Sequence, residues 1–253
     1  MMQRYGLIGK KLGHSFSKAY FTEKFVRLGI PAVYDLLEIA DISEILNVLK
    51  NHKPAGLNVT IPYKQAVIPY LDSLSEEAKA IGAVNTISFS ATEGVIHTKG
   101  WNTDAPAFMQ EMRSFAGDFK GSALLLGTGG ASAAAAYVLK KLGWDFVSVS
   151  RNPSSADQLS YQDLDAALIE SHTLIINATP IGMYPDVSGI PEIPWEAVGE
   201  KHLLFDMVYN PEVTRFLQSG LARGAKVRNG LGMLTKQAEL AWEIWQQNVN
   251  QVK

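Results

Sequence analysis

The chain has 253 residues, enough for one large domain or two modest ones, and its 47% hydrophobic and 19% charged residues are typical of a globular protein with a sizeable core. The net charge of -2, without a long basic block, argues against a nucleic-acid partner, and the absence of cysteine excludes disulfides, thiolate catalysis and cysteine-bound metals. The start lacks the features of a signal peptide, and no apolar run reaches the roughly 18 residues of a membrane span, so we expect a cytoplasmic protein that does not contact membranes.

The first hundred residues alternate strand and helix patterns. Strands are predicted over 4–9, 32–39, 56–61, 83–90 and 94–100. The last two are joined by the turn-rich ATEG and should form a hairpin. Helices are predicted over 17–30, from Asp41 to about 49, and within 71–82. This alternation is typical of an α/β domain with a mostly parallel sheet.

A second and clearer alternation follows, with the joint between domains expected near 101–106. Strands are predicted over 121–127, 145–150, 173–178, 202–209 and 225–230. Helices are predicted from about 105 to 114, over 131–143, near 161–170 and from about 232 to 247. We therefore expect a protein of two α/β domains, in which the last helix could return to the first domain.

A glycine turn opens this second region. Gly127, Gly129 and Gly130 lie between a buried strand and an alanine-rich helix, and Ser132 takes the place of the third glycine of a dinucleotide fingerprint. Glycines let the backbone approach a pyrophosphate, and the helix N-terminus offers free N–H groups to it. A tight turn in an unrelated α/β protein is the alternative.

The end of the next strand bears on the choice of cofactor. An NAD site usually has an acidic residue here for the ribose hydroxyls, but none occurs between Val147 and Ala156. Arg151 stands there instead, and a guanidinium suits the 2′-phosphate of NADP. NADP is therefore favoured over NAD, with a solvated loop arginine as the alternative.

Polar residues gather at the ends of the first-domain strands. The clusters are His14-Ser15-Phe16-Ser17, Asn58 with Thr60 and Lys64, Asn85-Thr86, and Asn102-Thr103-Asp104. They supply hydroxyls, amides, one lysine and one aspartate without metal-ligand spacing, which fits a small polyhydroxylated acid and the transfer of one proton. Taken singly, the serines and Asp104 could be helix caps, and the asparagines could hydrogen-bond backbone groups in turns. Lys64 could be an exposed lysine.

The stretch GLNVTIPYK, residues 56–64, shows how such a cluster could be presented. Leu57, Val59 and Ile61 alternate with the polar Asn58 and Thr60, as in a half-buried strand with its polar face opposite the core. Pro62 should then end strand pairing, so that Lys64 follows over the same edge.

The motifs together resemble the shikimate dehydrogenase family. They are HSFS (14–17), NVTIPYK (58–64), GAVNT (82–86), WNTD (101–104), GTGGAS (127–132), NATPIGM (177–183), DMVYNPEVT (206–214) and NGLGMLTKQA (229–238), in family order along nearly the whole chain. The resemblance implies reversible NADPH-dependent reduction of 3-dehydroshikimate to shikimate in aromatic amino-acid biosynthesis. It also implies a substrate-binding domain of residues 1–103 plus 235–253 and a Rossmann-like NADP-binding domain of residues 104–234. We expect a monomer or homodimer.

The resemblance also assigns roles to residues. Lys64 and Asp104 would be the catalytic pair, and Ser15 and Ser17 would hold the substrate carboxylate. The substrate-binding set is completed by Asn58, Thr60, Asn85 and Gln237. The cofactor-binding set would be Gly127, Gly129, Gly130, Ala131, Ser150, Arg151, Asn177, Thr179, Met207, Val208 and Gly230, with no metal.

The chain departs from the family pattern at several positions. Lys18 stands where a proline is usual, Ala107 where a glycine commonly follows NTD, and Ser150-Arg151-Asn152 where Asn-Arg-Thr/Ser is usual. There are two alternative functions. The chain could act on quinate with NAD, or it could be a metabolite sensor of the same fold without turnover.

Overall fold

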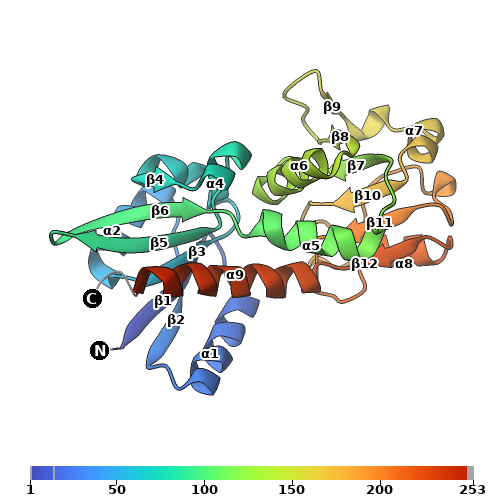
Figure 1. Ribbon diagram of the computed structural model, residues 1–253. Helices are drawn as coiled ribbons and strands as arrows, with labels where there is room; N and C mark the ends of the chain where they lie inside the picture. Colours follow the sequence, from blue (N-terminus) through green and yellow to red (C-terminus); the bar gives the residue numbers. More distant parts are fainter. Residues whose placement is uncertain (1, 14, 250–253) are drawn as a thin grey trace. The chain divides into compact units, whose positions relative to one another are not determined.

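The computed structural model describes residues 2–13 and 15–249, and these form two compact units. Unit 1 runs to Thr103 and resumes at Gln237, whereas unit 2 comprises Asp104–Lys236. Each unit has its own six-stranded sheet with helices packed on it, as Figure 1 shows. The predicted α/β class is therefore confirmed.

The sheet of unit 1 is mostly parallel. Its strands are β1 (Gln3–Gly9), β2 (Ala32–Glu38), β3 (Gly56–Val59), β4 (Ser73–Leu74), β5 (Thr86–Thr92) and β6 (Val95–Trp101), in the spatial order β2-β1-β3-β5-β6-β4. Only β5 runs against its neighbours β3 and β6. The predicted hairpin is confirmed, and its two-residue turn places Glu93 and Gly94 at φ 53° and 81°, as a type I′ turn requires.

Helices cover both faces of this sheet. They are α1 (Phe16–Leu28), the 3₁₀ turn η1 (Ile42–Glu44), α2 (Ile45–His52), α3 (Tyr63–Ala66), η2 (Ile68–Tyr70), α4 (Glu76–Ile81) and the unit 1 part of α9 (Leu231–Val249). α1 and α9 pack on one face and α2, α3 and α4 on the other. Asp41 caps its helix as predicted, through a capping box with Glu44, although the first turn is 3₁₀.

The prediction that residues 56–61 form a half-buried strand is wrong. All of β3 is buried, because it lies in the middle of a sheet that helices cover on both faces. Leu57 and Val59 do point to one core, and Asn58 points to the opposite face, but that face is closed by α1 and α9. Ile61 lies beyond the strand and is 60% exposed.

The C-terminal helix packs on unit 1 through Ala238, Ala241, Trp242 and Trp245. Trp245 is fully buried, and its Nε1 donates to the carbonyl of Ile87 at 3.1 Å. The indole passes directly over Gly56 in β3, where an added Cβ would overlap the indole ring. Gly56 is therefore required by the closeness of the tryptophan to the sheet.

The sheet of unit 2 is entirely parallel. Its strands are β7 (Ser122–Leu126), β8 (Asp145–Val149), β9 (Gln158–Leu159), β10 (Leu174–Asn177), β11 (Leu203–Asp206) and β12 (Lys226–Arg228), in the order β12-β11-β10-β7-β8-β9. This strand order reverses in the middle of the sheet, as in a Rossmann fold, whose ligand site lies at the reversal. The reversal falls between β7 and β10.

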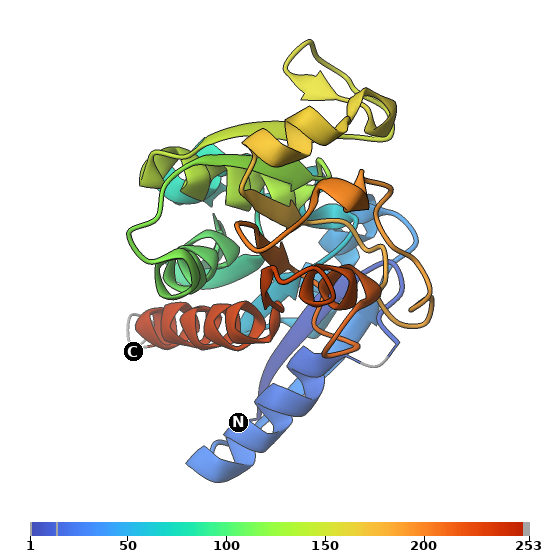
Figure 2. The ribbon, with the colours of Figure 1, turned by 90° about the vertical axis from the view of Figure 1, so that its right-hand side faces the viewer.

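Helices lie on both sides of this second sheet (Figures 1 and 2). They are α5 (Asp104–Ala116), α6 (Gly130–Leu142), η3 (Tyr161–Asp163), α7 (Ala166–Ser171), η4 (Trp195–Ala197) and α8 (Arg215–Leu221). α7 and α8 pack on one face, and Phe108 and Phe115 of α5 contact Phe205 on the other. The short elements α3, β9 and α8 were not predicted.

A buried carboxylate joins the ends of β10 and β11. Asp206 accepts from the Thr214 hydroxyl at 2.5 Å, from Asn177 Nδ2 at 3.0 Å and from the Val208 N–H at 3.0 Å. The bond to Val208 turns the backbone out of the sheet, so the predicted strand over 202–209 ends at Asp206. Burial raises the pKa of Asp206 to about 6, against the opposing effect of these hydrogen bonds.

We expect Gly56→Ala to lower the free energy of unfolding by about 1–3 kcal/mol, because the new methyl group overlaps the Trp245 indole. Chemical denaturation measures the loss. Gly199→Ala is the matched control, since no atom lies within 4 Å of its added Cβ. Equal stability of the two variants would contradict the packing described.

The Asp206 carboxyl should make stability fall with rising pH. Its pKa of about 6 in the folded state lies above the roughly 3.9 of an unfolded aspartate, so the folded state holds the proton more tightly. Stability from this group is complete below about pH 4 and is lost as pH rises through 6, by up to about 3 kcal/mol. Unfolding measured between pH 4 and 7 should show this decline for the native protein relative to Asp206→Asn; parallel profiles would contradict it.

Candidate functional site

The polar residues expected in the first-domain site gather at one edge of the unit 1 sheet. β1, β3 and β6 end at this edge and β5 begins there, since Ile8 pairs with Val59 and Thr86 pairs with Trp101. The segments that follow Gly9, Val59 and Trp101, and the one that precedes Thr86, therefore all lie on the same side of the sheet. Parallel strands explain why residues so far apart in sequence meet.

Two asparagine side chains form the centre of this edge. Asn58 Nδ2 donates to the Asn85 carbonyl and to Thr86 Oγ1, both at 3.2 Å. Asn85 Oδ1 accepts from the Thr103 N–H at 2.7 Å and from the Thr86 hydroxyl at 3.2 Å, and Asn85 Nδ2 donates to Thr103 Oγ1 at 2.9 Å. All four residues are buried, so the amides are held in fixed orientations.

The network continues to β2. Tyr34 donates to Asn58 Oδ1 at 2.7 Å. Burial raises the pKa of Tyr34, and the Ser17 side chain opposes this rise. Ser15 caps α1 by accepting from the Lys18 N–H at 3.4 Å, which matches the alternative of a helix cap. The structure thus brings Tyr34, Asn58 and Asn85 into one hydrogen-bonded chain. His14 of the HSFS motif lies outside the described residues.

The other predicted residues of this group are placed by backbone contacts. Thr60 follows β3 and donates its N–H to Ile8, while Lys64 lies half-buried in α3 and accepts from Val84 N–H through its carbonyl. Gln237 is half-buried on α9. Asp104 is buried and is the first residue of α5 in unit 2, directly after Thr103, whose N–H is held by Asn85.

The glycine turn of unit 2 has the geometry of a dinucleotide loop. Gly127 ends β7 at φ 109°, and an added Cβ would meet Ala178 and Thr179 atoms at 3.1–3.3 Å, so the loops after β7 and β10 touch. Gly129 is the N-cap of α6 and has nothing within 4 Å of its Cβ position. Ser132 donates to the Gly127 carbonyl at 2.6 Å, which closes the turn. The open backbone and the helix N-terminus fit a pyrophosphate.

The remaining predicted cofactor residues lie at the same edge of the second sheet. Asn177 Oδ1 accepts from the Thr179 N–H and hydroxyl at 3.1 and 2.6 Å. Gly230 follows β12 and lies so close to Met207 that an added Cβ would overlap the Met207 carbonyl. The Gly230 N–H donates to the Val208 carbonyl. Ala131 lies in the first turn of α6, beside the glycines.

The end of β8 carries the residues that are predicted to distinguish NADP from NAD. Ser150 is buried and its Oγ accepts from the Asn152 N–H at 3.2 Å. Arg151 between them is exposed. The charge of Arg151 also acts on Tyr161, where it lowers the phenol pKa against the larger effect of burial. An exposed guanidinium at this position is accessible to a phosphate.

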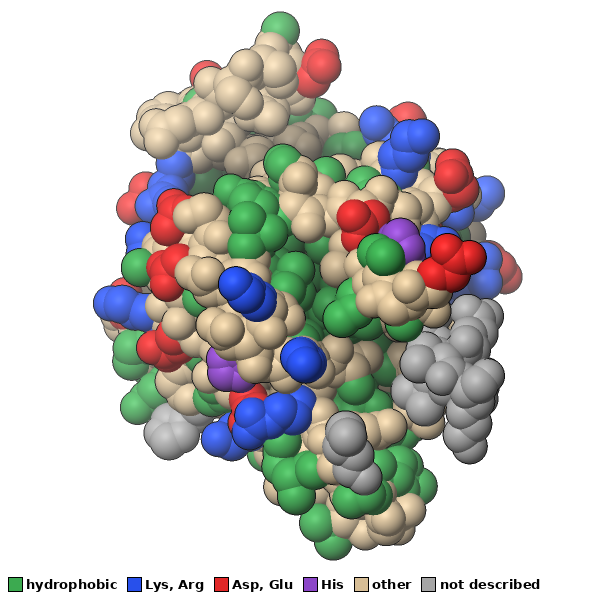
Figure 3. All heavy atoms as spheres, turned by 90° about the vertical axis from the view of Figure 1, so that its left-hand side faces the viewer, with side chains coloured by type: hydrophobic (Ala, Val, Ile, Leu, Met, Phe, Trp, Pro, Cys, Tyr) green, Lys and Arg blue, Asp and Glu red, His purple; other side chains and the backbone are tan. Residues whose placement is uncertain are grey.

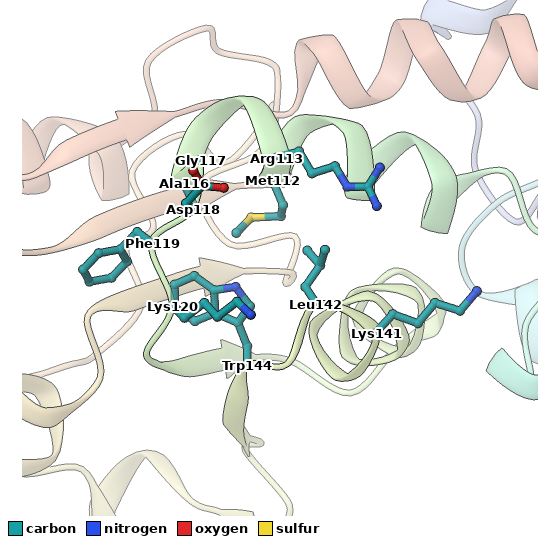
Figure 4. A pocket seen from close by; sticks show the side chains of 10 residues that line it. All are labelled: Met112, Arg113, Ala116, Gly117, Asp118, Phe119, Lys120, Lys141, Leu142 and Trp144. Atoms are coloured by element: carbon teal, nitrogen blue, oxygen red, sulfur yellow. The ribbon is translucent and has the colours of Figure 1, made fainter.

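A hollow of about 430 Å³ occurs elsewhere in unit 2. It lies before β7 and β8, at the sheet edge opposite the glycine turn, and includes Phe119 and Trp144 with ring centroids 5.9 Å apart. Figure 4 shows the side chains of Arg113 and Lys141 directed away from this aromatic pair. The hollow is therefore separate from the residues expected to bind a cofactor.

In the described part of the chain, the charged residues do not gather into a metal site. Within residues 2–13 and 15–249, no group of three or more His, Asp or Glu residues could hold a metal ion, and no helix has the length and apolar character needed to cross a membrane. On the face seen in Figure 3, Lys and Arg side chains are interspersed with Asp and Glu.

Sequence reasoning missed three residues that organise these edges: Tyr34, Asp206 and Thr214. Tyr34 occupies a strand position where an aromatic residue is expected for packing alone, so no local signal exists. Asp206 had a signal, because an aspartate at the end of an apolar strand must find partners when buried. Its partner Thr214 lies eight residues away, beyond a turn.

Comparison with known proteins supports these observations. A family model described as the shikimate dehydrogenase substrate binding domain matches residues 7–87. The NADP(+) shikimate dehydrogenase of Carboxydothermus hydrogenoformans is 35% identical over 95% of this chain and 90% of its own.

Two solved structures extend the comparison to the fold. Shikimate 5-dehydrogenase from Thermus thermophilus, in complex with NADP(H) and shikimate, matches with a TM-score of 0.82 at 33% identity, over 97% of this chain and 94% of its own. Quinate dehydrogenase from Corynebacterium glutamicum, in complex with NAD, matches with a TM-score of 0.85 at 28% identity, over 98% and 95%. The chain belongs to the shikimate dehydrogenase family.

Proposed function

We propose that this protein is an NADP-dependent shikimate dehydrogenase, which reversibly reduces 3-dehydroshikimate to shikimate in aromatic amino-acid biosynthesis. The buried amide network around Asn58 and Asn85 carries the proposal, because it holds polar groups ready at the edge that also presents Lys64. Relatives named as NADP(+) shikimate dehydrogenases, similar over nearly the whole chain, support the choice of substrate and cofactor. A cytoplasmic location and a monomer or homodimer are part of the proposal.

The two domains bind different ligands. Residues 1–103 with 235–253 form the substrate-binding domain and residues 104–234 the cofactor-binding domain, although Asp104 also contacts the substrate. Ser15 and Ser17 hold the substrate carboxylate, while Thr60, Asn85, Asp104 and Gln237 bind its hydroxyls. The amide of Asn58 is already hydrogen-bonded to Tyr34, Asn85 and Thr86, and Asn58 therefore orients the residues that bind the substrate hydroxyls.

Reduction of the ketone requires a proton donor beside the oxygen on which negative charge develops. The bound cofactor supplies the hydride for the ketone carbon. Lys64 stabilises the alkoxide oxygen and gives it a proton, which completes the secondary alcohol, and in the reverse direction Lys64 takes that proton back. Asp104 orients the ammonium and shares in the proton transfer.

The cofactor contacts follow the second sheet edge. Gly127, Gly129, Gly130 and Ala131 receive the pyrophosphate at the N-terminus of α6. Ser150 and Arg151 bind the adenosine 2′-phosphate. The rest of the dinucleotide is bordered by Asn177, Thr179, Met207, Val208 and Gly230. Asp206 fixes this border by holding Asn177 and Val208.

Oxidation of shikimate with NADP, followed by the absorbance of the reduced cofactor, tests the proposal. We expect turnover with shikimate and NADP at a higher kcat/KM than with quinate or NAD. Preference for quinate with NAD would instead identify a quinate dehydrogenase. Binding of both ligands without turnover would identify a sensor of the same fold, and either result would overturn the proposal.

Lys64→Ala should lower kcat for shikimate by about 10²–10⁴-fold with little change in KM, because the lysine acts mainly on the transition state. Steady-state kinetics at saturating NADP measures both constants. Lys79→Ala, which removes an exposed lysine from α4 of the same unit, is the control and should retain full activity. Near-normal kcat for Lys64→Ala would exclude the assigned role.

Arg151→Ala should raise KM for NADP by about 10–100-fold and leave KM for NAD almost unchanged. The reason is that only NADP carries the phosphate that a guanidinium hydrogen-bonds, and bonds to charged groups contribute about 1.5–3 kcal/mol. Arg113→Ala removes an exposed arginine elsewhere in unit 2 and serves as the control. An equal rise in KM for NADP and for NAD would mean that Arg151 does not bind the 2′-phosphate.

A further inference from the structure

Tyr34 is a buried tyrosine in the middle of β2, with 3% of its surface exposed. Its ring stacks on Phe21 of α1, with centroids 4.8 Å apart and planes inclined by 11°. The hydroxyl lies 2.7 Å from Asn58 Oδ1. Burial raises the pKa of Tyr34 far above its usual range, so the hydroxyl keeps its proton.

The partners of Asn58 determine the direction of this hydrogen bond. A backbone carbonyl can only accept, so the group of Asn58 that faces the Asn85 carbonyl is its NH₂. Its oxygen therefore faces Tyr34, which has one proton and must donate it to Asn58. Without the phenol, the carboxamide oxygen would lose this partner in a buried site, which is costly.

We infer that Tyr34 is a positioning residue for the substrate: it fixes the Asn58 carboxamide, and through it Asn85 and Thr86, in the orientation that binds the substrate hydroxyls. The inference rests on the proposed function.

Tyr34→Phe tests the inference, because it removes one oxygen and keeps the ring stacked on Phe21. We expect KM for shikimate to rise about tenfold, the effect of losing one buried hydrogen bond, while kcat changes less than about threefold. KM for NADP should stay within about twofold, since the cofactor residues belong to unit 2. A general loss of folded protein would lower kcat and leave both KM values unchanged.

Tyr5→Phe is the matched control. Tyr5 is a buried tyrosine of the neighbouring strand β1, and its hydroxyl donates to Gln3 rather than to a residue of the proposed site. The KM of Tyr5→Phe for shikimate should equal that of the native protein. If Tyr34→Phe and Tyr5→Phe have the same KM for shikimate, the inference is overturned.

A double-variant comparison tests the route through Asn58. When Asn58→Ala has already removed the carboxamide, adding Tyr34→Phe should change KM for shikimate by less than about twofold. A second full tenfold increase would show that Tyr34 acts independently, which contradicts the inference.

The rise in melting temperature that shikimate produces without cofactor gives a second readout, usable even for a variant of lower stability. It should be smaller for Tyr34→Phe than for the native protein and Tyr5→Phe, and an equal rise would overturn the inference. If the native protein is neither stabilised by shikimate nor able to oxidise it, the proposed function fails and the inference falls with it.

Discussion

The hydrogen bonds of two buried asparagine side chains, Asn58 and Asn85, hold the carboxyl edge of the first sheet together. A buried amide is costly unless its groups find partners, so the network must include β2, β5 and the segment after β6. The backbone immediately before Asp104 is fixed by the same network. A ligand hydroxyl that reaches this edge meets polar groups whose orientation is already determined, and little reorganisation opposes binding.

The edge of the second sheet is also held together by a buried polar group, in this case the carboxylate of Asp206. Its parallel strands leave polar residues at one edge, and Asp206 binds the loops after β10 and β11 to each other and to Thr214. On the other side of the strand reversal, Gly127 lets the loop after β7 approach the loop after β10. The backbone is left open at the glycine turn, where a dinucleotide phosphate would be bound.

Much of this organisation follows from the sequence. Long periodic segments, glycines after helices and the turn between β7 and α6 indicate the elements and the dinucleotide loop. The environment of β3 could not be predicted, because alternation does not reveal whether a second layer of helices covers the polar face. The role of Tyr34 could not be predicted either, since its partner Asn58 is 24 residues away and both fit an ordinary strand. Such pairings depend on strand order, which local patterns do not specify.

The hydrogen bonds hold the Asn58 and Asn85 amides in fixed orientations before any ligand binds. Nuclear magnetic resonance of the ligand-free protein, labelled with ¹⁵N at asparagine and assigned with single variants, tests this most directly. We expect a well-dispersed pair of slowly exchanging NH₂ signals for each of these two side chains, unlike those of the exposed Asn47. Rapid solvent exchange and averaged shifts at Asn58 and Asn85, similar to those of Asn47, would contradict it.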